Sequence, residues 1–201
     1  MGKARLEAFS DGVFAIAITL LVLTIPTPDD FHRLGHGLAQ QWPAYAAYLV
    51  SFTVIGIMWL NHHTIFGHFE HVDRNLVYLN LALLATIALL PYPTGIFGEA
   101  LRRGEGERTA AVFYSLVMTV NAMSWAALWL YGSTRRRLLV PAFPEEQRRT
   151  ATVIFTSGPV VYPVTILIGL LNAYACLAVH GALAVFYALD PLSRWVQRFT
   201  E

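Results

Sequence analysis

The chain is poor in charged residues and in cysteine, and each shortage excludes a class of protein. Aspartate, glutamate, lysine and arginine make up 13% of the 201 residues, about half the share found in an ordinary soluble domain. So few charges cannot cover the surface of a soluble globule, and the bilayer is the expected surrounding. The one cysteine, Cys176, excludes a disulfide or a cysteine-based metal site within one chain. A net charge of +1 without a basic domain argues against nucleic acid as a partner.

Apolar residues form 56% of the chain and give it a mean hydropathy of +0.50. A helix needs about 20 mostly apolar residues to span a bilayer. Six stretches meet or nearly meet this length: about Ala8–Ile25, Trp42–Phe66, Asn75–Phe97, Thr109–Tyr131, Thr150–Leu171 and Ala173–Leu189. The first is too long for the apolar part of a signal peptide, and no small-residue cleavage site follows it. We therefore predict an all-α integral membrane protein in which residues 1–201 form a single six-helix transmembrane unit.

Prolines mark several of the predicted helix ends. Pro91 and Pro93 are expected to bend or end the third helix. The fifth carries two prolines in its interior, and only about one residue, Asn172, separates it from the sixth. The last two helices are therefore expected to form a tight antiparallel hairpin, with the sixth ending at Asp190-Pro191.

Lysine and arginine predict the orientation of the chain in the membrane, because they are enriched in cytoplasmic segments. Six spans place both termini on one side. If that side is the cytoplasm, the inner segments hold ten such residues: Lys3, Arg5, Arg74, Arg135, Arg136, Arg137, Arg148, Arg149, Arg194 and Arg198. The outer loops hold four: Arg33, Arg102, Arg103 and Arg108. We predict cytoplasmic termini in a multi-pass protein of the cell membrane. The inner loop Gly132–Arg149 is basic. Its charge is explained by this topology, and contact with anionic lipid headgroups is the alternative explanation.

The first apolar stretch carries a long stripe on one face. Its members lie three and four residues apart, which places them on one side of a helix: Arg5, Phe9, Gly12, Ile16, Leu20 and Leu23. Packing inside one subunit is the ordinary explanation for such a stripe. Thr19 lies beside it, three residues after Ile16, as a polar step on an otherwise apolar face.

The first three predicted helices bring polar side chains to the same depth near their inner ends. Ser10 and Asp11 point away from the stripe on either side, since successive residues are rotated by about 100°. Four polar residues of the next two helices lie at about this level: Asn61, His62, His63 and Asn80. Polar groups within spans are costly and are usually paired. We expect Ser10 and Asp11 to hydrogen-bond to Asn61, His62 or His63, holding the first helix against the second and third.

The same residues carry a resemblance to a known family. Arg5, Phe9, Ser10 and Asp11, spaced Arg-x-x-x-Phe-Ser-Asp, resemble the signature of the endolysosomal potassium channels and their bacterial homologues. Three further segments are similar to that family: Trp59-Leu60-Asn61-His62-His63, Asn80-Leu81 and Pro91-Tyr92-Pro93-Thr94. The resemblance covers the first half of the chain in its motifs and the second half only in length and helix number.

This resemblance implies a channel that conducts K⁺ passively and has no catalytic residue, metal or cofactor. Bacterial members form homotetramers in which the first helix of each six-helix subunit lines a central pore. Counted from the Ser-Asp pair, the family's hydrophobic constriction falls on Ile16, Leu20 and Leu23, and Thr19 falls on a position associated with selectivity. The remaining motif residues are then a scaffold that holds this helix: Arg5, Phe9, Ser10, Asp11, Trp59, Asn61, His62, His63 and Asn80.

Two usual means of ion selection are missing from the sequence. It has no Thr-Val-Gly-Tyr-Gly segment to supply rings of backbone carbonyls, and no acidic residue lies on the stripe beyond Gly12. A dry constriction remains, in which rings of isoleucine and leucine close the pore by dewetting.

Three other functions are weaker alternatives. A histidine-ligated membrane metalloenzyme would need its ligands together, yet His32 and His36 are expected outside and the group His62 to His71 inside. A secondary transporter is suggested by Pro159 and Pro163, which are typical of a broken, ion-binding helix. The sequence argues against a transporter, because no acidic residue lies near the middle of any span to couple transport to a proton or Na⁺. A non-conducting scaffold protein also stays open.

Overall fold

The computed structural model describes residues 2–28, 31–141 and 144–189, without the side chain of Arg136. The predicted end of the sixth helix at Asp190-Pro191, and Arg194 and Arg198 of the charge pattern, lie outside these residues. The described helices are α1 (Lys3–Leu20), α2 (Leu34–Gln40), α3 (Trp42–Gly67), α4 (Arg74–Leu89), α5 (Pro91–Arg103), α6 (Glu107–Thr134), α7 (Glu145–Leu171) and α8 (Ala173–Leu189). Short 3₁₀ turns occupy Leu21–Thr24, Phe31–Arg33 and Arg136–Leu138.

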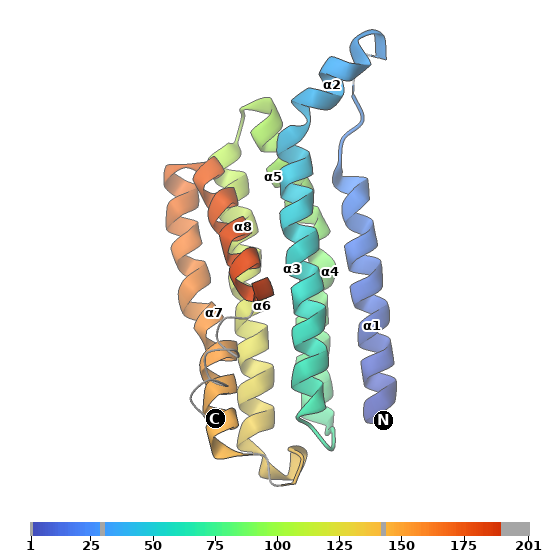
Figure 1. Cartoon of the computed structure of the whole chain (residues 1–201), viewed down its shortest axis with the longest axis vertical. Helices are drawn as coiled ribbons and strands as arrows, with labels where there is room; N and C mark the ends of the chain where they lie inside the picture. The colour runs from blue at the N-terminus through green and yellow to red at the C-terminus, as the bar shows by residue number, and fades with distance from the viewer. Residues whose placement is uncertain (1, 29–30, 142–143, 190–201) are drawn as a thin grey trace.

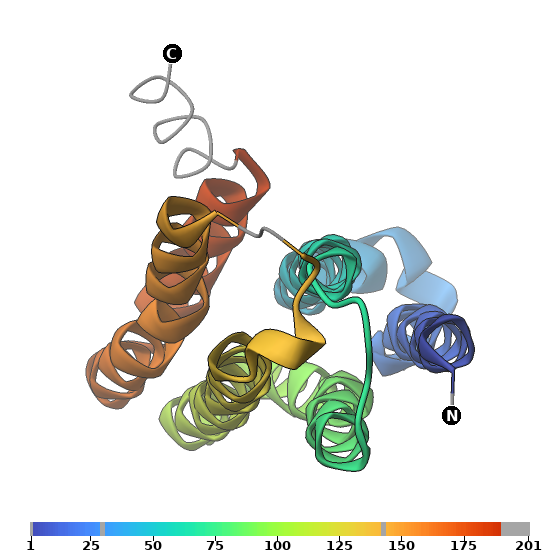
Figure 2. The same cartoon turned by 90° about the horizontal axis from the view of Figure 1, so that it is seen from below.

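The long helices run side by side along one axis (Figure 1). Seen along that axis, α1 lies at one edge, α7 and α8 lie at the opposite edge, and α3, α4 and α6 lie between them (Figure 2). Five described segments are long and apolar enough to cross a membrane: Lys3–Thr24, Trp42–Gly67, Arg74–Arg103, Glu107–Thr134 and Glu145–Leu171. The apolar helix α8 is shorter, with 17 residues. The all-α multi-pass membrane architecture is thus confirmed.

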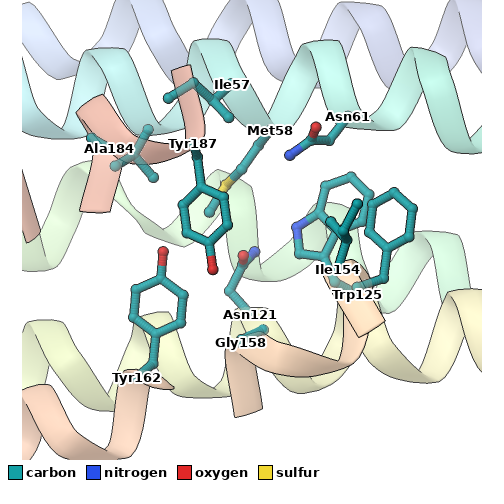
Figure 3. Close-up of a pocket in the computed structure, with 13 residues that line it drawn as sticks. Ile57, Met58, Asn61, Asn121, Trp125, Ile154, Gly158, Tyr162, Ala184 and Tyr187 are labelled. Carbon is teal, nitrogen blue, oxygen red and sulfur yellow. The ribbon is translucent and has the colours of Figure 1, made fainter. Parts of the chain in front are cut away.

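The core lies between α3, α4, α5 and α6. Its largest fully buried side chains include Trp129 and Tyr114 of α6 and Phe66 of α3. The outer helix α7 packs on α6 through small residues, where Gly169 lies against Ala111, as is common between membrane helices. The described part of α8 reaches partway along α7 (Figure 1), and a cavity lies between α3, α6, α7 and α8 (Figure 3).

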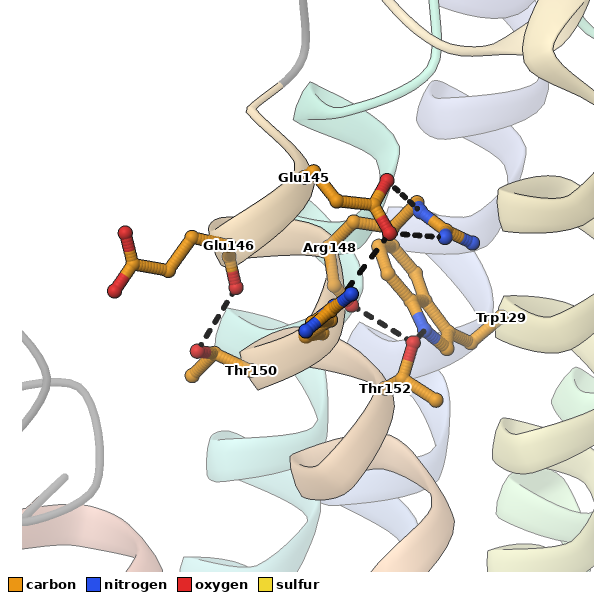
Figure 4. A network of polar contacts seen from close by, with 7 residues as sticks. Trp129, Glu145, Glu146, Arg148, Thr150 and Thr152 are labelled. Atoms are coloured by element: carbon orange, nitrogen blue, oxygen red, sulfur yellow. Dashed lines mark hydrogen bonds and ion pairs between the residues drawn. The ribbon is translucent and has the colours of Figure 1, made fainter.

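Helix boundaries differ from the predicted ones where capping and proline decide them. Helix α7 begins at Glu145, about five residues before the predicted start, because Pro144 precedes it and acidic residues in a first turn favour the helix dipole. Arg148 pairs with Glu145 in this first turn, and Trp129 of α6 donates a hydrogen bond at 2.9 Å to Thr152, seven residues further along α7 (Figure 4).

Proline has opposite effects on the third and fifth predicted helices. The third is interrupted at Leu90, because Pro91 has no N–H to donate and begins α5. The fifth, α7, stays helical through Pro159 and Pro163. The broken helix on which the transporter alternative depended is therefore absent from α7. Helix α2, between the first two spans, was not predicted.

The loop after α3 is fastened to the loop after α6. Phe69 forms an isolated antiparallel bridge with Leu139, and its fully buried ring lies against Gly132 of α6. Asp73 caps α4 by accepting from the Leu76 N–H, and it also accepts from the Tyr131 hydroxyl and Arg137. Partial burial raises the pKa of Asp73, but these hydrogen bonds outweigh it and hold the pKa below its usual range. The two loops are thus one connected unit.

The substitution Gly132→Ala tests this packing. A Cβ at Gly132 would overlap the Phe69 ring, so we expect a loss of about 1–3 kcal/mol in the free energy of unfolding, as for an overpacked core. Gly67→Ala is the matched control, because a Cβ at Gly67 would meet nothing within 4 Å. Thermal unfolding in detergent measures both. Equal unfolding temperatures for the two variants would show that the Phe69 ring is not held against α6.

Candidate functional site

Helix α1 has two faces of opposite character. Leu6, Ser10, Phe14 and Ala17 are buried against the rest of the chain. All six residues of the stripe are exposed, with exposed fractions of 61% for Ile16, 42% for Leu20 and 76% for Leu23. Packing inside one subunit therefore does not explain the stripe.

The far end of α1 is docked on α5. The 3₁₀ turn Leu21–Thr24 buries Leu21, and the Thr24 hydroxyl donates to the Leu21 carbonyl at 2.7 Å. Gly95 of α5 allows the close approach, since a Cβ there would lie 3.1 Å from the Thr24 Cβ. The direction in which Leu23 points is thus set by a packed contact.

Thr19 lies on the exposed side of α1. Its hydroxyl is 2.8 Å from the Ala15 carbonyl and 3.0 Å from the Ile16 carbonyl, and it donates within its own helix. The hydrogen is therefore engaged, and the Thr19 oxygen is left as an acceptor on the exposed face.

A buried chain of hydrogen bonds joins α1, α3 and α4. Asn80 of α4 donates from Nδ2 to the Ser10 hydroxyl oxygen at 3.0 Å, and its Oδ1 lies 2.9 Å from Nε2 of His62. The amide oxygen can only accept, so His62 carries its proton on Nε2. All three side chains are buried. The His62 ring is also held between Phe14 of α1, at 5.4 Å between ring centroids, and Phe66, at 4.4 Å.

A second contact at the same depth joins α1 and α3 at the surface. The Trp59 indole Nε1 donates to Oδ1 of Asp11 at 2.9 Å, and both side chains are exposed. Trp59 and His62 are three residues apart, so both lie on the face of α3 that meets α1. We name these two contacts, Ser10–Asn80–His62 and Asp11–Trp59, the anchor.

The anchor corrects the predicted partners of Ser10 and Asp11. Neither binds Asn61, His62 or His63 directly: Ser10 reaches His62 through Asn80, and Asp11 binds Trp59. Asn61 follows Trp59 by about 200° of helix rotation and lines the cavity on the other side of α3. His63 is exposed.

Two residues of the predicted scaffold and one unpredicted residue complete this region. Arg5 and Phe9 are exposed, and the Arg5 side chain makes no hydrogen bond or ion pair among the described residues. Phe14, which packs against His62, was not predicted. The sequence does carry a signal for Phe14. It lies four residues after Ser10 and three before Ala17, and therefore on the face opposite the stripe.

The substitution Asp11→Ala tests the exposed half of the anchor. It leaves the Trp59 N–H without its acceptor, and we expect a loss of about 1 kcal/mol, a typical net value for one hydrogen bond. Asp11→Asn is the control, because its amide oxygen can still accept from Trp59. The thermal unfolding temperature and the yield of assembled protein measure both variants. Normal stability and normal assembly of Asp11→Ala would contradict a scaffold role.

Metal ligands are not grouped in the described part of the chain. Among residues 2–28, 31–141 and 144–189, no three His, Cys, Asp or Glu side chains lie close enough together to hold a metal ion. His62, the histidine nearest α1, is engaged by Asn80.

Comparisons with known proteins cover nearly the whole chain. Residues 5–91, which contain α1 from Arg5 onward and all of the anchor, match the family model described as endosomal/lysosomal potassium channel TMEM175. A potassium channel of Streptomyces collinus is 45% identical, over 94% of this chain and 92% of its own length. A potassium channel of Chamaesiphon minutus is 36% identical, over 92% of this chain and 93% of its own length.

A solved structure supports the same relationship. The crystal structure of a lysosomal potassium-selective channel TMEM175 homologue from Chamaesiphon minutus matches with a TM-score of 0.84 and 34% identity, covering 94% of this chain and 97% of that one. Sequence and fold therefore agree over more than nine-tenths of the chain. The chain belongs to the family of the endosomal/lysosomal potassium channel TMEM175.

Proposed function

We propose that this chain is the subunit of a potassium channel in which four copies place the stripe of α1 around a central pore. The observation that carries the proposal is that every residue of the stripe is exposed while the opposite face of α1 is anchored. Relatives that align along nearly their whole length are named potassium channels. K⁺ is the permeant ion, and no cofactor takes part.

The composition of the stripe favours a pore wall over contact with lipid. Gly12 and Thr19 interrupt the apolar face of α1, and Arg5 lies at its beginning. The outward face of α7 is exposed too, and its exposed members Val153, Val160, Val164 and Leu167 are apolar, with the half-buried Ser157 as the polar residue among them. Helix α1 is therefore the better candidate for a wall that meets water and ions.

The constriction is formed by rings of Ile16, Leu20 and Leu23. Such rings exclude water when narrow, and ions then face a barrier because their hydration shells are lost without replacement. Thr19 offers the one polar atom at this level, and its oxygen is an acceptor that suits a cation. Gating then requires these rings to widen or rotate.

The anchor determines the direction in which the stripe points. Ser10–Asn80–His62 and Asp11–Trp59 fix the beginning of α1, and the Thr24–Gly95 contact fixes its end. The stripe is then held outward toward its symmetry mates.

The topology follows from charge and length. All six apolar helices cross the membrane, including α8, whose 17 residues lie at the lower limit for a span. Both termini face the cytoplasm, on the side that carries the basic residues near α1, α4 and α7.

The test is ion flux through purified protein in liposomes. With a K⁺ gradient we expect flux that does not saturate with concentration and that is faster for K⁺ than for Na⁺. Native mass spectrometry is expected to give four subunits. Absence of K⁺ flux, or saturable flux coupled to a counter-ion, would contradict the channel; a dimer or monomer with normal flux would contradict only the tetramer.

A further inference from the structure

A cavity lies inside each subunit, away from α1. It is formed by α3, α6, α7 and the last described turns of α8, and it has a volume of about 80 Å³ that opens to the surroundings (Figure 3). Gly158 of α7 lines the cavity, and α7 packs closely on α6 there, since a Cβ at Gly158 would lie 2.9 Å from the Ala122 Cβ. The cavity lies among the membrane-spanning helices, so the bilayer is the phase beside it.

Four polar side chains converge on this cavity. They are Asn61 of α3, Asn121 of α6, Tyr162 of α7 and Tyr187 of α8. The hydroxyls of Tyr162 and Tyr187 point toward one another and toward the Asn121 amide, and Asn61 points in from α3 (Figure 3). Asn121 donates to the Thr86 hydroxyl at 2.7 Å.

The other three polar groups have no partner within the described part of the chain: neither the Asn61 amide nor the hydroxyls of Tyr162 and Tyr187 form a hydrogen bond there. An unpaired polar group at membrane depth costs free energy, because no water is present to replace the bond. The three groups are accessible from the cavity and not sealed in the protein, so an occupant that both donates and accepts hydrogen bonds would satisfy them.

The lining also defines the charge and shape of that occupant. Among the residues that the structure describes, no Asp, Glu, Lys or Arg lines the cavity, so an ion would be desolvated there without compensation. Most of the remaining wall is apolar, with Met58, Trp125 and Phe155 among its members. A neutral molecule with one hydrogen-bonding group and an apolar body fits both features.

We propose that this cavity binds a neutral alcohol or phenol that is dissolved in the bilayer. Its hydroxyl group lies among Asn61, Tyr162 and Tyr187, and its apolar part lies against Trp125 and Phe155. The site is separate from the stripe. Only one layer of side chains separates it from the anchor, because Asn61 precedes His62 and the Trp125 ring meets the His62 ring at 6.3 Å between centroids.

Photolabelling of the full-length protein in liposomes tests this site without measuring conduction. The probe is an octanol that carries a diazirine on its chain, and labelled residues are identified by mass spectrometry. We expect labelling to concentrate on Tyr162, Tyr187 and Met58, and to fall at least severalfold with excess 1-octanol. Octane lacks the hydroxyl and octyl sulfate is charged, so neither should compete at the same bilayer concentration.

A double variant tests the hydrogen bonds. In Asn61→Leu/Tyr187→Phe, the concentration of 1-octanol that halves the labelling should rise roughly tenfold, as expected for the loss of neutral hydrogen bonds. Tyr92→Phe is the matched control, since it removes a phenol hydroxyl from an exposed position on α5. Competition by octane as strong as by 1-octanol would overturn the proposal. An absence of labelling in the cavity would also overturn the proposal, and is the result expected if water or the chain itself fills the cavity. If the double variant does not fold, the three competitors on the unmodified protein decide the question alone.

Discussion

Replacing Ile16 with asparagine is expected to raise the resting K⁺ current at least tenfold and to reduce the preference for K⁺ over Na⁺. Ile16 is an exposed member of the stripe, and four amide groups in place of four isoleucines would hold water in the constriction and lower the barrier to ions. A fall of about 1.4 kcal/mol in that barrier suffices for a tenfold effect. Currents across a planar bilayer, recorded with K⁺ and Na⁺ on opposite sides, measure both quantities.

The matched control for this prediction is Val160→Asn. Val160 is as exposed as Ile16 but lies on the outward face of α7, so the same polar group there should leave conduction unchanged. Leu20→Ala and Leu23→Ala should also raise the resting current, because each widens a ring of the constriction. Unchanged currents in all three stripe variants would remove the stripe from the pore.

Replacing Asn80 with leucine is expected to cause the largest loss of stability. Asn80 bonds to both Ser10 and His62, and its removal leaves the buried Nε2 of His62 without its acceptor, at about 1–3 kcal/mol, while the Ser10 hydroxyl keeps its bond to the Leu6 carbonyl. Because α1 is then held only by Asp11–Trp59 and by packing, the yield of assembled channel should fall as well. Thermal unfolding in detergent and native mass spectrometry measure the two effects.

Two further variants distinguish a lost network from a generally damaged protein. Thr53→Val removes an exposed hydroxyl that bonds only within α3, and it should change the unfolding temperature little. In a double-mutant cycle, Ser10→Ala combined with Asn80→Leu should cost less than the sum of the single changes, because the two residues share a bond. Strictly additive losses would show that Ser10 and Asn80 do not act together.

The sequence predicted the helices well because hydrophobic length and proline position determine them locally. The predicted span Trp42–Phe66 differs from α3 by one residue. The start of α7 was missed because its first turn is polar and is secured by the ion pair of Glu145 with Arg148.

The two faces of α1 could be predicted, but the partners of its polar residues could not. A spacing of three and four residues places Ser10 and the stripe on different faces whatever surrounds the helix. Which residue of α3 meets Asp11 depends on how α3 is rotated and shifted along its axis, and that is determined by packing. Trp59 and Asn61 lie at nearly the same depth, yet one contacts α1 and the other lines the cavity.

Block by Cd²⁺ of the Ile16→Cys variant tests most directly whether four copies of α1 meet around a pore. The chain has one native cysteine, Cys176, which is buried, so the new thiol is the one presented to the pore. Four thiols around one axis form a soft site that binds Cd²⁺ tightly. We predict strong block of the K⁺ current that a chelator reverses, and no block in Ala17→Cys, whose side chain position is buried inside the subunit. Block of Ala17→Cys with no effect on Ile16→Cys would contradict the pore-lining role of the stripe.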